Sequence, residues 1–175
     1  MSSITAAHWH LLFNHLPVVG DLFTVILLIY ALIRNNAELK RAALIACIIV
    51  GITGFMADTT GGPAAQATRN LPGINRDDVR AHAQSADSAL IAAEVLGALG
   101  IVGLVLALRK KEVAEITTNP RVWAKTYKVP PSWVMILCLL LSLADAYLML
   151  RAANLGGAIR HPEIRDVPAS VPATT

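Results

Sequence analysis

Four long apolar stretches occupy most of this chain and constrain its fold more than any other feature. They cover approximately residues 11–33, 40–57, 88–108 and 133–152. A helix needs about 20 mostly apolar residues to cross the hydrocarbon core of a bilayer, and each stretch reaches that length with its flanking residues. The sequence therefore predicts an all-α, integral membrane four-helix bundle formed by residues 1–165, followed by a mobile, proline-rich tail at 166–175.

The composition agrees with a membrane protein. Only 15% of the residues are charged, whereas soluble domains carry about 25%. The net charge of +3 does not indicate nucleic-acid binding, because the basic residues flank apolar stretches rather than forming one patch. Cys47 and Cys138 lie inside apolar stretches, and we expect no disulfide between them. The N-terminus has no basic region before the first stretch and no A-x-A cleavage site, so we expect the first helix to remain in the protein.

The distribution of Lys and Arg predicts the orientation of the bundle. Nine of the fifteen basic residues lie in the connections at 34–41 and 109–132, namely Arg34, Lys40, Arg41, Arg109, Lys110, Lys111, Arg121, Lys125 and Lys128. Cytoplasmic loops carry an excess of basic residues. Both termini and the connection at 58–87 then face outward, which in a bacterial inner (cytoplasmic) membrane is the periplasmic side. The glycines of "TTGGPAAQATRNLPGIN" are expected to end the second helix after Asp58, whereas "RDDVRAHAQSADSAL" reads as a helix that continues into the third stretch.

All five histidines fall on the predicted outer side. His8, His10 and His15 precede the first stretch, His82 precedes the third, and His161 follows the fourth. Three separate chain segments therefore bring histidine to one face of the bundle.

The spacing of these histidines refines the prediction. His8 and His15 are seven residues apart, so a continuous helix places them on one face, about 10 Å apart along its axis, while His10 points elsewhere. Pro17 is expected to start or kink the helix just after His15. His82 lies six residues before the third stretch, about 9 Å outside the apolar core and level with His8.

A second group of polar residues lies inside the stretches. Asp21, Glu94 and Asp145 each lie about 10 Å below the outer end of a helix. Carboxyl groups at this depth are not expected to face lipid, so they should point into the bundle, towards each other or towards Arg151. This layer would tune the site or relay protons.

Each of these features also has a simpler interpretation. An interfacial histidine can be solvated or bonded to a phosphate headgroup, and the acidic residues can be protonated, hydrogen-bonded contacts between helices. The glycines of the second and third stretches fit close helix packing better than ligand contact. These are Gly51, Gly54, Gly97, Gly100 and Gly103.

Two histidines from different helices can bind a haem iron axially, and four-helix bundles often provide the frame. No C-x-x-C-H motif is present, so the haem would be b-type and bound non-covalently. Space beside the glycines would accommodate the macrocycle, and Arg80, Arg151 or Arg160 would pair with its propionates. His15 with His82, or His8 with His161, are candidate pairs. A Zn, Cu or Fe ion is the alternative cofactor, although neither H-E-x-x-H nor Glu-x-x-His occurs.

Short motifs resemble a group of small bacterial four-helix membrane proteins that has no settled activity. "HWHLLFNHLPVVGDLF" resembles their opening, in which two histidines stand a few residues apart and the second precedes an apolar residue and proline. "ANLGGAIRHPEIR" resembles their Gly-Gly and histidine ending, and "GFMADTTGGPAA" their Thr-Gly turn. The resemblance covers most of residues 8–165, and its motif residues map onto His10, His15, Gly156, Gly157 and His161, with His8 additional. Some relatives are fused to cytochrome c modules, which implies a redox context.

The sequence predicts a multi-pass membrane protein with a one-sided histidine site that binds b-type haem or a metal for electron transfer. His15, His82 and His161 are the favoured ligands. A periplasmic cytochrome, a quinol or a larger membrane complex is the expected partner. The alternative, from another class, is a non-catalytic structural or anchoring subunit of a larger membrane complex. A transporter is disfavoured because the cytoplasmic halves of the stretches carry few polar groups.

Overall fold

The structure, a computed structural model, describes residues 6–68, 70–108 and 129–161 and is all-helical over them. Its helices are α1 (Ala6–Phe13), α2 (His15–Arg34), α3 (Ala37–Thr68), α4 (Arg76–Leu108) and α5 (Ser132–Arg160). The predicted tail and most of the 109–132 connection lie outside the described residues. Four candidate spans, of which α1 and α2 together form the first, are long and apolar enough to cross a membrane. Large apolar side chains such as Ile33, Ile91 and Tyr147 are exposed on their outer faces, as expected of helices that face lipid.

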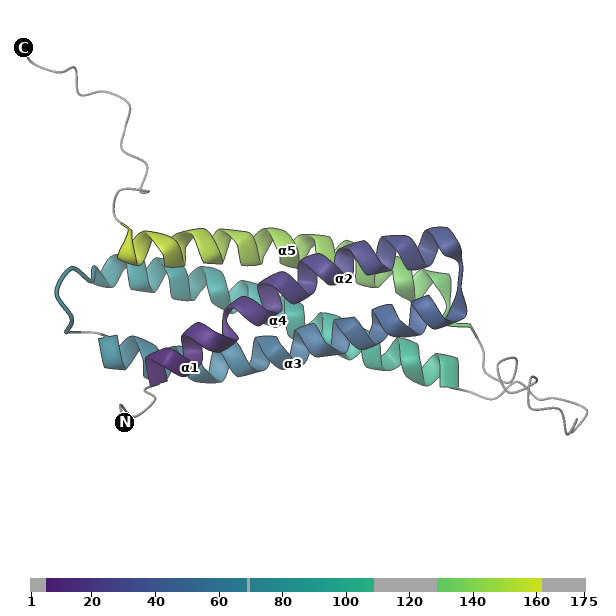
Figure 1. The fold of residues 1–175 in the computed structure, drawn as a ribbon, viewed down its shortest axis with the longest axis horizontal. Helices are drawn as coiled ribbons and strands as arrows, with labels where there is room; N and C mark the ends of the chain where they lie inside the picture. Colours follow the sequence, from purple (N-terminus) through teal and green to yellow (C-terminus); the bar gives the residue numbers. More distant parts are fainter. Residues whose placement is uncertain (1–5, 69, 109–128, 162–175) are drawn as a thin grey trace, which may run out of the picture.

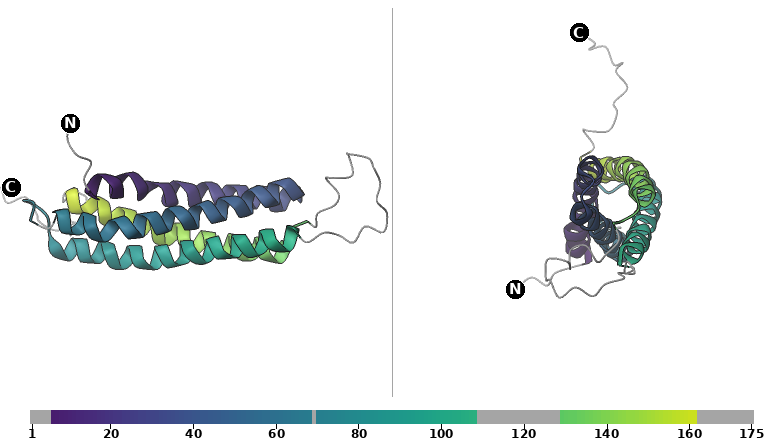
Figure 2. Two further views of the ribbon diagram at one scale, coloured as in Figure 1. Left: turned by 90° about the horizontal axis from the view of Figure 1, so that it is seen from below. Right: turned by 90° about the vertical axis from the view of Figure 1, so that its right-hand side faces the viewer.

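The helices form an antiparallel bundle. Helix α3 packs between α2 and α4, and α5 packs between α4 and α2. The start of α1, the end of α3, the start of α4 and the end of α5 lie at one end of the bundle (Figures 1 and 2). We call this the histidine end, because His10 and His82 lie there. The opposite end, where α2 ends at Arg34 and α3 begins beside Lys40, is called the basic end.

The first span is interrupted once, between α1 and α2. Asn14 is not assigned to either helix but keeps helical backbone angles, and its N–H donates to the carbonyl of His10 at 2.9 Å. Helix α2 begins at His15, so Pro17 falls in its first turn, where proline is tolerated because no intrahelical N–H bond is required. The predicted start at this point is therefore confirmed.

Helix α3 is longer than the sequence predicts. It continues ten residues beyond Asp58 to Thr68 and contains Pro63, so the predicted break after Asp58 is wrong. Threonine hydroxyls in this segment donate to carbonyls of the preceding turn, as Thr60 does to Met56 at 2.9 Å. Helix α1 also packs along α3. Tertiary contact thus outweighs the low helix propensity of the glycines. The predicted continuous helix from Arg76 through the third span is confirmed.

Glycines let α3 and α4 approach closely. A Cβ atom added to Gly51 would stand 3.0 Å from the Cα of Gly97, and one added to Gly100 would stand 2.7 Å from the carbonyl oxygen of Leu44. Small residues at a membrane helix interface permit this contact between backbones. The close-packing interpretation of these glycines is confirmed. The expectation that they leave room for a macrocycle is wrong, because the neighbouring helix fills the space.

Polar side chains close the basic end. Asn35 adopts a left-handed conformation (φ 45°) and ends α2, and Asn36 accepts hydrogen bonds from the N–H groups of Glu38 and Leu39 at the start of α3. The ammonium of Lys40, only 2% exposed, donates to Asn35 Oδ1 at 2.7 Å and to Ser132 Oγ at 3.1 Å. Lys40 therefore joins the α2–α3 turn to the first residue of α5.

Candidate functional site

One stripe of α1 and α2 faces the rest of the bundle. Its members alternate at spacings of four and three residues: His10, Asn14, Pro17, Asp21, Thr24, Leu28 and Ala31 are all buried or half-buried. This spacing keeps residues on a single helical face. The stripe is polar toward the histidine end and apolar toward the basic end, and it carries His10 and Asp21 on the same face.

His10 is oriented by α3. Its Nδ1 lies 3.2 Å from the hydroxyl of Thr60, which donates its own hydrogen to the carbonyls of Met56 and Ala57. The hydroxyl must therefore accept, and His10 Nδ1 carries the proton. The ring also lies beside Gly61, where an added Cβ would stand 3.5 Å from its Cε1. His10 is thus held between a threonine and a glycine of α3, on a different face from the exposed His8 and His15, as their spacing predicts.

His82 has a similar environment at the α4–α5 contact. Its Nδ1 lies 2.9 Å from the carbonyl oxygen of Ala152. A carbonyl can only accept, so the imidazole donates from Nδ1. A Cβ atom added to Gly156 would stand 3.1 Å from the Cε1 of His82. Gly156, the first glycine of the Gly-Gly motif, therefore provides the surface against which this imidazole packs.

The remaining histidines lie further out. His15 is exposed, and its Nδ1 donates to the carbonyl of Leu11, at the end of α1, at 3.0 Å. His8 is exposed on α1, and His161 is exposed at the C-terminus of α5. His8 and His15 thus both lie outside the buried stripe. Of the favoured ligands, the structure brings His15 and His82 into electrostatic range of His10.

His10, His15 and His82 share one hydrogen-bonding arrangement. In each ring Nδ1 binds a protein oxygen, so the lone pair is on Nε2. Fixing the tautomer through Nδ1 is how proteins prepare Nε2 for a metal or a proton. His15 and His82 both lie within electrostatic range of the His10 ring, so the three imidazoles occupy one neighbourhood at the histidine end.

The described residues contain no group of three or more His, Cys, Asp or Glu side chains placed to hold a metal ion. The three predicted metal ligands, His15, His82 and His161, accordingly do not form a compact cluster there. The candidate ligands are therefore two imidazoles, His10 of α1 and His82 of α4, rather than a cluster of three or four residues.

Two of the predicted acidic residues meet in the core. Asp21 and Asp145 are both 0% exposed and lie close enough to interact electrostatically. Ser142 donates a hydrogen bond to Asp21 Oδ1. The other oxygen of Asp21 and both oxygens of Asp145 have no partner among the described residues. Unpaired buried carboxylates are costly in a membrane, so this pair needs a proton or a cation to be neutralised.

The other two predicted members of this layer lie elsewhere. Glu94 is exposed on α4, so the expectation that it points into the bundle is wrong. The preceding residue, Ala93, is buried. Consecutive side chains of an α-helix are about 100° apart around its axis, so Glu94 lies outside the buried face. Arg151 is also exposed, and across the described ranges the ion pair found is Arg41 with Glu38. The predicted pairing of Asp145 with Arg151 is therefore wrong.

A pair of thiols lies in the core beside the acidic pair. Cys47 of α3 and Cys138 of α5 are free and fully buried, and Cys47 lies within electrostatic range of both Cys138 and Asp21. The sequence did not indicate this proximity, because the two residues come from α3 and α5, which are not consecutive in the chain.

Comparison of the chain with known protein families, with curated proteins and with solved structures finds no match. The resemblance to small bacterial four-helix membrane proteins therefore stays a prediction, and the function must be argued from the residues of this chain.

Proposed function

We propose that this protein binds b-type haem through His82 and His10 at the histidine end and transfers electrons on that side of the membrane. The single observation that carries the proposal is the pair of imidazoles from different helices, each fixed through Nδ1 and each with its Nε2 lone pair available. His15 shares this arrangement and is the alternative partner of His82.

The donor set favours haem over a bare metal ion. A Zn, Cu or Fe site needs three or four protein ligands, whereas haem supplies four nitrogens itself and requires only axial ligands from the protein. The described residues offer imidazole pairs but no larger cluster. In this chain the role of α3 and α5 is to orient the two rings, through Thr60 and through the carbonyl of Ala152.

The proposed orientation places the histidine end in the periplasm of a bacterial inner membrane. Arg34, Lys40 and Arg41 lie at the opposite end, and basic residues favour the cytoplasmic side. A periplasmic cytochrome or a quinol would then exchange electrons at the histidine end.

The test is a visible spectrum of the full-length, detergent-purified protein, oxidised and then reduced with dithionite, together with a pyridine haemochrome assay. We expect a sharp reduced α-band and about one haem per chain, in keeping with axial histidine ligation. His82→Ala and His10→Ala should each remove the low-spin spectrum, whereas His8→Ala, which alters an exposed histidine on the same helix as His10, should leave it intact.

A featureless spectrum from protein expressed with ample haem would overturn the proposal. Loss of the band on His15→Ala but not on His10→Ala would transfer the axial role to His15. Metal analysis of the same samples would then address the Zn, Cu or Fe alternative.

A second candidate function is supported by Glu94. This carboxyl is exposed inside the membrane-spanning segment of α4, about 10 Å below its outer end, where contact with lipid is unfavourable. A structural or anchoring subunit would cover it with a partner helix that donates a hydrogen bond. Glu94→Leu should then release a stoichiometric partner from the protein purified in mild detergent, whereas Val95→Leu on the neighbouring exposed position should retain it. Equal behaviour of the two variants would exclude this role for Glu94.

A further inference from the structure

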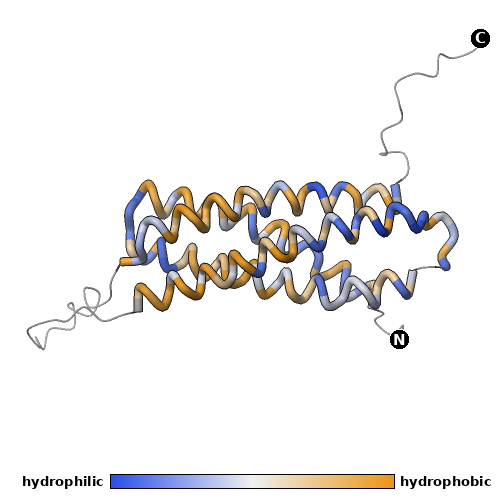
Figure 3. The backbone as a smooth tube through the Cα atoms, turned by 180° about the vertical axis from the view of Figure 1, so that it is seen from behind, coloured by the Kyte–Doolittle hydropathy of each residue, from blue (hydrophilic) through white to orange (hydrophobic). Residues whose placement is uncertain are grey.

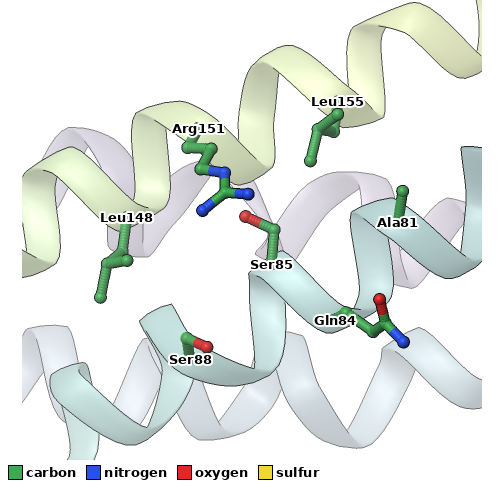
Figure 4. A pocket seen from close by; sticks show the side chains of 7 residues that line it. All are labelled: Ala81, Gln84, Ser85, Ser88, Leu148, Arg151 and Leu155. Carbon is green, nitrogen blue, oxygen red and sulfur yellow. The ribbon is translucent and has the colours of Figure 1, made fainter.

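A cavity of about 250 Å³ lies between α4 and α5 beside the histidine end. Helix α4 lines it with Gln84, Ser85 and Ser88, and α5 lines it with Leu148, Arg151 and Leu155 (Figure 4). Its polar groups are a guanidinium, an amide and two hydroxyls, and no carboxylate lines it. The cavity therefore offers hydrogen-bond donors and positive charge on an otherwise apolar wall.

Two of these groups have no partner of the kind that would neutralise or satisfy them among the described residues. Arg151 makes no ion pair with a carboxylate in the parts of the chain that the structure describes. Ser85 is 9% exposed, and its Oγ has no hydrogen-bond partner among the same residues. Figure 4 shows the guanidinium and this hydroxyl pointing toward one another across the cavity. A buried hydroxyl without a partner is costly, and an acceptor placed between the two groups would satisfy both.

The depth of the cavity identifies the source of that acceptor. The mostly apolar segment of α5 from Trp133 to Leu150 is about 27 Å long at 1.5 Å per residue, close to the hydrocarbon thickness of about 30 Å. Arg151 follows it directly. On α4 the apolar segment from Ala89 to Leu108 is about 30 Å long, and Ser88 precedes it directly. Both helices therefore place the cavity at the boundary between acyl chains and headgroups, where phospholipid phosphates lie.

We propose that this cavity binds the phosphate of an anionic phospholipid from the leaflet at the histidine end. Arg151 forms a bidentate, charge-assisted contact with the phosphate oxygens, and Ser85 donates its hydroxyl to the same group. Leu148, about one turn closer to the bilayer centre than Arg151, contacts the glycerol and the first methylenes of the acyl chains. The site is independent of the histidines, because none of them lines the cavity.

The experiment counts bound lipid by native mass spectrometry on the delipidated, full-length protein titrated with phosphatidylglycerol. We expect one tightly bound phosphatidylglycerol, an affinity at least about tenfold lower for Arg151→Gln, and an intermediate affinity for Arg151→Lys, which keeps the charge but loses the bidentate geometry. Ser85→Ala should weaken binding less. Arg76→Gln is the matched control, because it removes the same charge at the same end of the bundle outside this cavity.

Equal retention of phosphatidylglycerol by Arg151→Gln and the wild type would overturn the proposal. Displacement of the lipid by excess inorganic phosphate would overturn the lipid as the source and assign the cavity to a free oxyanion. Equal affinity for phosphatidylcholine would overturn the requirement for an anionic headgroup. His10→Ala, which would end the proposed haem site, should leave the lipid count unchanged, so the two proposals fail separately.

Discussion

The two halves of the bundle are built from the same helices, but one half has an apolar core and the other contains polar side chains. Toward the basic end the core consists of Leu28, Leu44, Met135 and their apolar neighbours, and α4 presses against α3 through glycines. From the middle to the histidine end, the interior contains His10, Asn14, Asp21, Ser142 and Asp145. Hydrophobic residues are more frequent toward the basic end, and hydrophilic residues are more frequent toward the histidine end (Figure 3).

This difference shows which part of the molecule maintains the fold and which part is available for chemistry. Close packing between apolar helices and small residues stabilises membrane bundles. Buried polar groups without partners destabilise them and are kept in proteins where they have a use. We therefore expect the largest losses of stability from substitutions in the basic half, and smaller losses, together with effects on ligand binding, from substitutions in the histidine half.

The largest expected effect is at the glycine contact of the basic half. Gly100→Leu would force a side chain into the carbonyl of Leu44, which an added Cβ already approaches to 2.7 Å, and should lower the free energy of unfolding by about 3 kcal/mol or more. Gly62→Leu is the matched control in the histidine half, because an added Cβ there meets nothing within 4 Å. Unfolding in mixed detergents measures both, and similar losses would show that the two halves do not differ in packing.

Ser142→Ala should have the next largest effect. It removes the donor to Asp21 and leaves a fully buried carboxyl oxygen without a partner, which costs about 1–3 kcal/mol. Ser85→Ala is the control, since the Ser85 hydroxyl has no partner to lose among the described residues. If both variants unfold alike, the Ser142–Asp21 bond contributes nothing to stability.

Thr60→Val tests the hydrogen bond that orients His10. Thr59→Val is its matched control, because Thr59 also donates to the carbonyl of Met56 but does not contact the histidine. We expect the Thr60 variant to be less stable than the Thr59 variant by about 0.6 kcal/mol, the average for hydrogen bonds between membrane helices. The nitrogen chemical shifts of the His10 ring should change only in the Thr60 variant. An unchanged ring signal would mean that Thr60 does not fix the tautomer.

The smallest effect should come from Asp145→Asn. Both oxygens of Asp145 lack partners among the described residues, so the substitution loses no hydrogen bond and removes repulsion from Asp21. We expect the free energy of unfolding to stay within about 0.5 kcal/mol of the wild type or to rise. A loss of 2 kcal/mol or more, on the order of the cost of an unsatisfied buried partner, would show that the carboxyl is a structural contact.

The spans could be predicted from the sequence because hydropathy and length are sums over neighbouring residues. The end of α3 could not, since helix through Gly61, Gly62 and Pro63 depends on contact with α1. The breaker residues alone argue for a turn. Threonine hydroxyls and a packed neighbouring helix change the outcome.

The sequence predicted the depth of the site residues along the helix axes, but not the helix face on which each side chain lies. Depth follows from counting residues at 1.5 Å each, and it placed Asp21 and Asp145 correctly together. Rotation follows from the buried stripe, and the spacing of Asp21, Thr24, Leu28 and Ala31 extends back to His10 rather than to His8 or His15. For Glu94, the small residues of α4, among them Ala93, Gly97 and Gly100, mark the buried face and leave the carboxyl outside it.

The length of α4 determines where His82 lies relative to the membrane. Its 33 residues make a rod of about 50 Å, while the hydrocarbon core is about 30 Å thick. Because its apolar segment extends to Leu108, the surplus of about 20 Å projects entirely at the histidine end. His82 lies about 10 Å beyond the outer end of the apolar segment, at the depth of the lipid headgroups. Under the proposed function, a carrier dissolved in water would therefore reach His82 without entering the hydrocarbon core of the bilayer.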